Sequence, residues 1–131
     1  MRFTKMHGLG NDFVMVDCFK EKLDEAALPD LARRVCDRHF GVGADGVILA
    51  ESSDKADVRM RLINADGSEA ENCGNGIRCT AKLIYDNGHT QSERITVETV
   101  GRINVLDLYV RDGKVETVLL EMREPVFQRD A

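Results

Sequence analysis

The segment Cys73-Gly74-Asn75-Gly76 places a thiol and two glycines directly before an expected helix. The first backbone N–H groups of a helix have no partner within it and point at whatever lies in front. Glycines there let a ligand approach closely, so an anion such as a carboxylate fits. The positive end of the helix dipole also stabilises a thiolate, by about 0.3–1 kcal/mol at an exposed site. Cys73 is therefore a candidate acid–base residue, with the alternative that it only fills a tight turn.

Residues 41–46 read Gly-Val-Gly-Ala-Asp-Gly and match the glycine pattern of dinucleotide-binding folds. That pattern binds a pyrophosphate only where a strand precedes it and a helix follows. Here the expected order is a helix and then a strand, so the pattern predicts a loop that needs positive backbone angles. The acidic run at 64–71 lacks the spaced oxygen ligands of a calcium loop, and no metal site is expected.

Apolar patterning predicts the elements that must position Cys73. Two helices are expected: one carries Pro29 in its first turn and stops before Gly41, and one follows Gly76 and ends near Asn87-Gly88. Apolar residues cover much of the second helix, which indicates that a sheet wraps it on more than one side. Six to eight strands and two helices make an α+β fold, with strands predicted at 3–6, 12–17, 46–50, 58–62, 94–99, 103–111 and 114–122.

Composition narrows the class of protein. The 131 residues suit a single domain over 1–131, with 43% hydrophobic and 31% charged residues, as in a folded soluble chain. No run of apolar residues is long enough to span a membrane, and a net charge of −5 argues against nucleic acid as a partner.

The start of the chain carries no secretory signal, so a cytoplasmic location is expected. The four cysteines are then expected to be unpaired thiols, and none forms a C-x-x-C pair. Cys18, Cys36 and Cys79 are predicted to be small buried hydrophobic residues.

Four blocks of residues together resemble the N-terminal half of diaminopimelate epimerases. Each block alone would be a weak signal, but all four occur in the order and approximate spacing of that family and cover essentially the whole chain. The blocks are Lys-Met-His-Gly-Leu-Gly-Asn-Asp-Phe (5–13), Gly-Val-Gly-Ala-Asp-Gly (41–46), Asn-Ala-Asp-Gly-Ser (64–68) and Asn-Cys-Gly-Asn-Gly-Ile-Arg-Cys (72–79).

The resemblance implies a mixed β-sheet rolled around a central helix, in one of two similar halves. It also implies a cofactor-independent epimerase that interconverts LL- and meso-2,6-diaminopimelate in lysine and cell-wall biosynthesis. In that family each half supplies one cysteine. One removes the α-proton as a thiolate and the other returns a proton to the opposite face as a thiol. The implied partner is a small amino-acid substrate, with no cofactor and no metal.

Carried onto this sequence, the resemblance makes Cys73 one of the two acid–base residues. Gly74 and Asn75 would donate backbone N–H groups to the substrate α-carboxylate. Asn11 and Asn64 would hydrogen-bond the substrate through their side-chain amides. Both asparagines could equally form turns, because asparagine is common there, and the two roles can coexist.

Neighbouring residues of the same blocks receive other roles. Asp12 and Asp66 are expected to cap turns, His7 to be structural and Arg78 to face away from the ligand. Some family members place a substrate-contacting glutamine where this chain has Gly46.

The second cysteine of the family is not expected among these residues, because the chain ends about where the family's first half ends. Three explanations stay open. The chain could be the N-terminal domain of a longer enzyme whose C-terminal half is missing, or a homodimer that brings two copies of Cys73 together across a two-fold axis. It could also be a non-catalytic carboxylate- or amino-acid-binding domain or a thiol-redox protein.

Overall fold

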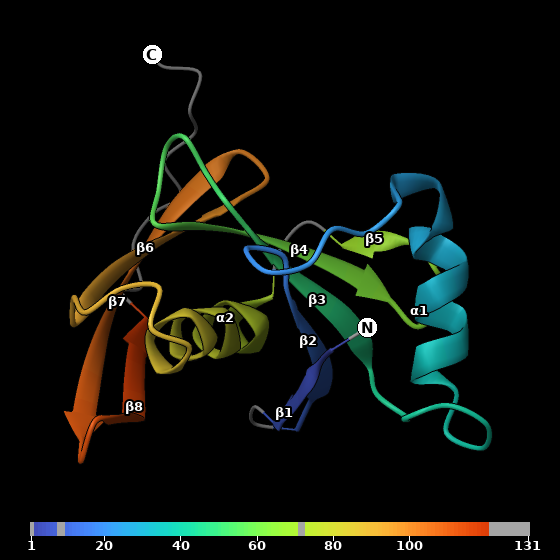
Figure 1. The fold of residues 1–131 in the computed structure, drawn as a ribbon, viewed down its shortest axis with the longest axis horizontal. Helices are drawn as coiled ribbons and strands as arrows, with labels where there is room; N and C mark the ends of the chain where they lie inside the picture. The colour runs from blue at the N-terminus through green and yellow to red at the C-terminus, as the bar shows by residue number, and fades with distance from the viewer. Residues whose placement is uncertain (1, 8–9, 71–72, 121–131) are drawn as a thin grey trace.

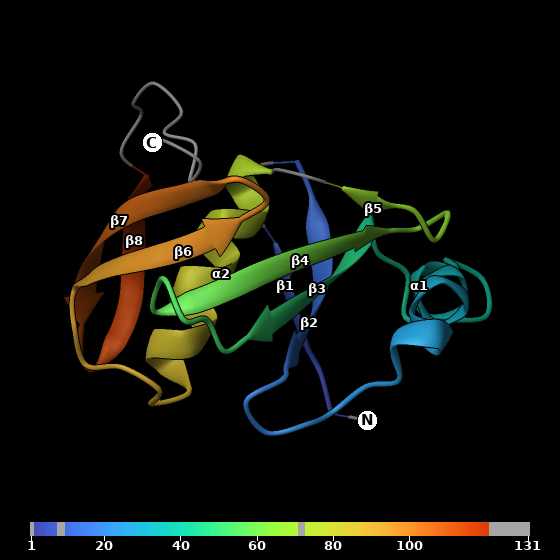
Figure 2. The ribbon, with the colours of Figure 1, turned by 90° about the horizontal axis from the view of Figure 1, so that it is seen from above.

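The computed structural model describes residues 2–7, 10–70 and 73–120. One curved sheet runs in the order β1-β2-β3-β4-β6-β7-β8, with β5 paired beside β4 (Figures 1 and 2). The helical elements are the short η1 (Glu25–Ala27), α1 (Leu28–Cys36) and α2 (Gly74–Asp86). The strands are β1 (Thr4–His7), β2 (Asp12–Asp17), β3 (Gly46–Glu51), β4 (Val58–Asn64), β5 (Glu69–Ala70), β6 (Arg94–Thr99), β7 (Arg102–Arg111) and β8 (Lys114–Leu120).

The sheet rolls around α2. Strands β6, β7 and β8 lie on one side of this helix and β1 to β4 on the other (Figure 1). The pairs β2–β3 and β4–β6 are parallel and the other pairs are antiparallel, so the sheet is mixed. Ile77 and Ile84 of α2 are buried in the same core as Ile95 and Leu106 from the far strands. The expected mixed sheet around a central helix is confirmed.

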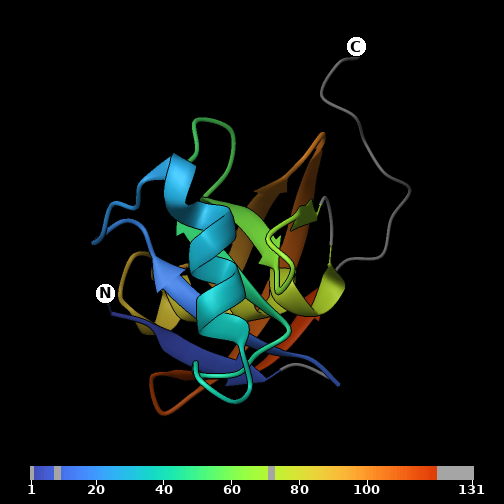
Figure 3. The same cartoon turned by 90° about the vertical axis from the view of Figure 1, so that its right-hand side faces the viewer.

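A second core lies on the outer face of the sheet under α1 (Figure 3). Side chains alternate between the two faces of a strand. Phe13 and Met15 of β2 therefore enter the core around α2, while Val14 and Val16 enter the core under α1. Burial on both faces explains the nearly continuous apolar sequence of β2 and β3.

The carboxyl end of α2 closes as the sequence predicts. Gly88 adopts a positive φ of 81°, which glycine reaches without steric cost. The N–H of Gly88 donates to the Tyr85 carbonyl at 3.0 Å, and the N–H of His89 donates to the Ile84 carbonyl at 2.9 Å. This pair of hydrogen bonds is the Schellman motif, which satisfies the last carbonyls of the helix.

The structure differs from the sequence prediction by one or two residues at the ends of several strands, such as β4, and at the start of α2. Helix α2 begins at Gly74, before the apolar pattern that predicted it, and the short elements η1 and β5 were not predicted. Glycine has a low helix propensity, so only the packing of α2 against the sheet makes its glycine-rich first turn helical. The predicted strand residues 121–122 lie outside the described part of the chain.

Within the described ranges, no helix is long and apolar enough to cross a membrane.

Candidate functional site

The predicted site residues lie close together at one end of the central strands β2, β3 and β4. Asn11 and Asp45 precede the parallel strands β2 and β3, and Asn64 is the last residue of the antiparallel strand β4. Gly46 pairs with Asn64 across the β3–β4 ladder, so these three positions lie at the same end. The side chain of Asn75 donates to the Asn11 side chain at 3.0 Å, which places the N-terminus of α2 at that end of the strands.

Cys73 is the residue immediately before α2. Its backbone is extended (φ −159°, ψ 112°), and its carbonyl accepts the helical hydrogen bond of the Ile77 N–H at 2.9 Å. The half-buried Cys73 side chain makes no capping hydrogen bond to the helix and packs beside the core around α2. The thiol therefore lies at the N-terminal end of the helix dipole, as the sequence predicts.

Two glycines of this first turn have different surroundings. A Cβ placed on Gly74 would make only ordinary van der Waals contacts, the nearest at 3.8 Å to Arg78 Nη1. A Cβ on Gly76 would lie 2.9 Å from the Ile48 methyl carbon Cδ1. Close packing therefore does not require the glycine at position 74, whereas Gly76 lets the helix pack closely on β3.

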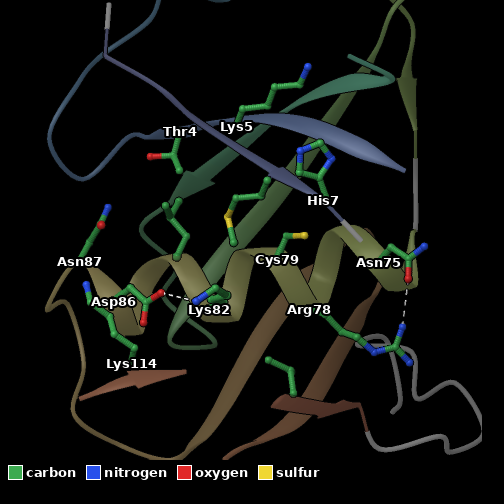
Figure 4. A pocket seen from close by; sticks show the side chains of 13 residues that line it. Thr4, Lys5, His7, Asn75, Arg78, Cys79, Lys82, Asp86, Asn87 and Lys114 are labelled. Atoms are coloured by element: carbon green, nitrogen blue, oxygen red, sulfur yellow. Dashed lines mark hydrogen bonds and ion pairs between the residues drawn. The ribbon is translucent and has the colours of Figure 1, made fainter. Parts of the chain in front are cut away.

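Asn11 and Asn75 form a chain of hydrogen bonds. The Asn11 Nδ2 donates to Asp45 Oδ2 at 3.4 Å, and the Asn11 Oδ1 accepts from Asn75 Nδ2. The Asn75 Oδ1 in turn accepts from Arg78 Nη1 at 3.2 Å (Figure 4). The expectation that Arg78 faces away from the ligand stays a prediction. Its guanidinium contacts the side chain of Asn75, a residue predicted to bind the ligand. Positions 75 and 78 are three residues apart on α2, a spacing at which side chains meet, so helical periodicity could have indicated this contact.

In the described part of the chain, the Asp12 carboxylate contacts cations and accepts no turn N–H, unlike the capping role expected for it. It forms ion pairs with Arg38 at 3.2 Å and with Lys5 at 3.4 Å. Hydrogen bonding to Arg38, and further to Lys5, holds the pKa of Asp12 well below its usual range. Arg38 follows α1 far along the sequence, so only the fold brings this cation to the start of β2.

Asp66 and Asn64 form the turn after β4. Asp66 Oδ1 accepts from the Ser68 N–H at 2.9 Å, which confirms the expected capping role. Asn64 Nδ2 donates to the Ser68 hydroxyl at 3.2 Å, so this amide has the structural role that the sequence allowed. Contact between Asn64 and a ligand stays a prediction.

The other three thiols are in different surroundings. Cys36 and Cys79 are buried as expected, whereas Cys18 is only half-buried because it follows β2 at the margin of the core under α1. Burial raises the pKa of the Cys79 thiol to about 11, and the neighbouring Cys73 adds to the rise. Burial, then the Glu51 carboxylate, raise the pKa of Cys18 to about 11. Burial also raises the pKa of Cys36. These three cysteines remain protonated at neutral pH.

No side chain can stand at Gly46 without movement of β4. A Cβ there would lie 2.8 Å from Leu62 Cδ1 and 3.0 Å from the Ile63 carbonyl oxygen. The contact that some family members make through a glutamine is therefore not available from this position. Among the described residues, no three His, Cys, Asp or Glu side chains gather to hold a metal ion.

A groove of about 690 Å³ adjoins the candidate site. It lies along α2 between the two edge strands of the sheet, β1 and β8. Asn75 and Arg78 line it (Figure 4). His7, expected to be structural, presents an exposed side chain to this groove. The remaining lining residues include the cations Lys5, Lys82 and Lys114 and the apolar Met6, Leu83 and Val118.

Solved structures share this fold at low sequence identity. A methylitaconate-delta-isomerase matches 86% of this chain and 35% of its own with a TM-score of 0.71 at 14% identity. A hydroxyproline epimerase from Agrobacterium vitis matches 92% of this chain and 40% of its own with a TM-score of 0.70 at 16% identity. By fold, the chain is thus one half-barrel domain of the class found in these isomerases and epimerases.

The sequence comparisons are more specific. Residues 3–127 match the family model described as diaminopimelate epimerase. The diaminopimelate epimerase of Pelotomaculum thermopropionicum is 54% identical over 129 residues, which cover 98% of this chain and 46% of that protein. That of Agathobacter rectalis is 56% identical over 126 residues, 96% of this chain and 44% of that protein. The chain belongs to the diaminopimelate epimerase family, and it spans less than half the length of these relatives.

Proposed function

We propose that this chain forms one half of a cofactor-independent epimerase acting at the α-carbon of 2,6-diaminopimelate. The observation that carries the proposal is the position of the Cys73 thiol at the N-terminus of α2. The Asn11–Asn75 hydrogen bond lies at the same end of that helix. Membership of the family and the names of the relatives support the choice of substrate.

In the proposed reaction, the Cys73 thiolate removes the α-proton from one face of the substrate and becomes a thiol. The electron pair of the C–H bond remains on the α-carbon, and a second thiol donates its proton to the opposite face and becomes a thiolate. The reverse reaction exchanges the two roles. The carbanion must be stabilised as it forms, and N–H donors at a helix N-terminus supply such stabilisation.

The substrate α-carboxylate would accept hydrogen bonds from the backbone N–H groups of Gly74 and Asn75. Gly74 carries no side chain, which supports close approach of the ligand to its backbone. Asn11, which precedes β2, and Asn64, at the end of β4, would contact the substrate from either side of β3. These four residues and Cys73 are the proposed site.

The second thiol must come from outside this chain. That thiol must also serve as a thiolate in the reverse reaction, and the raised pKa values of Cys18, Cys36 and Cys79 disfavour their thiolates. We propose that the remaining half of a longer family chain supplies this thiol, because the relatives are more than twice as long as the matched segment. A second copy of this chain is the alternative source.

The direct test is a chimera in which this chain replaces the matching 46% of the Pelotomaculum thermopropionicum relative. Deuterium uptake at the α-carbon in deuterated water, followed by NMR, measures proton exchange. Cys73→Ala is expected to lower the exchange rate by about 10²- to 10⁴-fold, the usual contribution of an acid–base group. Cys18→Ala, which removes another half-buried cysteine outside the site, is the matched control and should keep the rate.

A folded Cys73→Ala chimera with an unchanged rate would contradict the proposal. A chimera that binds diaminopimelate without exchanging its α-proton would instead indicate a binding domain. The same assay on the isolated chain then shows where the second thiol comes from. Conversion of LL- to meso-diaminopimelate that depends on Cys73 would identify a second copy as its source, and no conversion beside an active chimera would identify the other half.

A further inference from the structure

Asp45 connects the loop before β2 to the start of β3. Its Oδ2 accepts from the Asp12 N–H at 2.9 Å and from Asn11 Nδ2 at 3.4 Å. Its Oδ1 accepts from Arg38 Nη2 at 3.1 Å, and its own N–H donates to the Asp12 carbonyl at 2.9 Å. Asp45 belongs to the glycine-rich loop at 41–46. It has no part in the proposed reaction.

The chain of hydrogen bonds from Asp45 to Arg78 has a direction. A carboxylate only accepts hydrogen bonds and a guanidinium only donates them, while an amide does both through different atoms. Asp45 therefore requires the NH₂ end of the Asn11 amide, and Arg78 requires the oxygen end of the Asn75 amide. With these ends set, Asn75 Nδ2 meets Asn11 Oδ1 as donor and acceptor. A reversed Asn11 amide would oppose two oxygens at Asp45 and two NH₂ groups at Asn75.

We propose that Asp45 is a positioning residue, which fixes the orientation of the Asn11 amide and holds it against the N-terminus of α2. The identity of the ligand in this inference rests on the proposed function. An amino acid presents a carboxylate, which needs N–H donors, and an ammonium group, which needs oxygen acceptors. Reversing the Asn11 amide would exchange a donor for an acceptor, so its orientation determines how well a zwitterionic ligand is bound.

Asp107 provides a matched control for the removal of Asp45. The side chains of Asp45 and Asp107 are 39% and 38% exposed, and each accepts a hydrogen bond from one arginine. Asp107 pairs with Arg94 across β6 and β7, away from the candidate site. Both Asp→Ala variants therefore remove one exposed ion pair, and only Asp45→Ala also removes the acceptor of Asn11 Nδ2 and of the Asp12 N–H.

The first measurement uses the unliganded chain. The side-chain amide signals of Asn11 and Asn75 are assigned by their loss in Asn11→Asp and Asn75→Asp in ¹H–¹⁵N NMR spectra. Asp45→Ala should shift both signals, whereas Asp107→Ala should shift neither. Unchanged signals in Asp45→Ala would overturn the inference, whether or not the chain takes part in an epimerase.

The second measurement uses the chimera described above. Asp45→Ala should lower kcat/KM for diaminopimelate about tenfold, the effect of one lost hydrogen bond in the site. Asp45→Asn keeps one acceptor oxygen and should lose less, and Asp107→Ala should match the parent. Equal kcat/KM for Asp45→Ala and Asp107→Ala would overturn the inference. If the parent chimera itself is inactive, the proposed function fails, and the amide signals alone decide the role of Asp45.

Discussion

Arg61 is the residue with the densest set of charged contacts in the described ranges, and it lies outside the candidate site. Its guanidinium forms two hydrogen bonds to the Glu69 carboxylate, at 3.0 and 2.9 Å, and further ion pairs with Glu25 and Glu51. The Arg61 side chain is only 14% exposed. Hydrogen bonds to Glu69 and Glu25 raise the pKa of Arg61 above its ordinary value. This one cation connects β4 to β5, η1 and β3.

Removal of Arg61 should therefore destabilise the fold without touching the site. We expect Arg61→Ala to lower the free energy of unfolding by about 1.5–3 kcal/mol, because three carboxylates lose their shared cation. Arg61→Lys should recover only part of this loss, because lysine cannot form the paired bonds to Glu69. Urea denaturation measures both changes.

Arg59 is the control for this prediction. It lies two residues before Arg61 on the same face of β4, with an exposed side chain. Arg59→Ala should change the free energy of unfolding by no more than about 0.5 kcal/mol. Equal losses for Arg59→Ala and Arg61→Ala would show that the ion pairs of Arg61 contribute nothing specific to stability.

At the scale of the elements, the contact between α2 and β3 decides where the candidate thiol lies. Gly76 is buried in the first turn of α2, and its hypothetical Cβ would meet Ile48, which is fully buried, and the Met60 sulfur at 3.4 Å. A larger residue would push the helix away from the sheet and move Cys73 with it.

Gly76→Ala should lower the free energy of unfolding by about 1–2 kcal/mol, because overpacking a close-packed core exceeds the gain in helix propensity. Gly74→Ala serves as the control, because its Cβ would make only ordinary contacts, at 3.8 Å to Arg78 and 3.9 Å to Leu120. That variant should keep or slightly increase stability. Thermal unfolding compares the two, and a Gly76→Ala chain as stable as Gly74→Ala would disprove the close-packing account.

At the scale of the whole molecule, partly buried and paired carboxylates join distant segments. Asp17, at the end of β2, accepts from Asn87 at 2.8 Å and contacts His89 at 2.6 Å, both beyond the carboxyl end of α2. Burial alone would raise the pKa of Asp17, but the hydrogen bonds from His89 and Asn87 bring it below its ordinary value. Asp12 has a lowered pKa at the opposite end of the same strand, through Arg38.

These shifts predict loss of stability in acid. A carboxyl group whose pKa is lower in the folded chain stabilises the fold above its unfolded pKa of about 3.9, and this contribution is lost as the pH falls below that value. The free energy of unfolding should therefore be nearly constant from pH 7 to pH 5 and decrease from pH 4 to pH 2. Urea denaturation at each pH measures it. Asp17→Asn should flatten this decrease, and an unchanged slope in that variant would exclude the Asp17 contacts as a cause.

Local sequence patterns were sufficient for most of the fold. The boundaries of β2 and β6, the turn at Asp112-Gly113 and the end of α2 near Gly88 agree with the structure. Apolar–polar alternation, helical spacing and turn residues all involve positions close together in the chain, so they can be recognised in the sequence itself. The position of Cys73 before a glycine-rich helix start is local in the same sense.

The tertiary structure alone decided which side chains meet. Asn11 and Asn75 bond across 64 positions of sequence, and Asn11 and Asp45 across 34. Such contacts depend on strand order and register, which the packing of distant apolar faces determines and no local pattern records. The sequence by itself therefore determined the elements and the candidate thiol. Only the folded sheet decided that Asn11, which contacts Asp45, meets Asn75 at the helix terminus where that thiol lies.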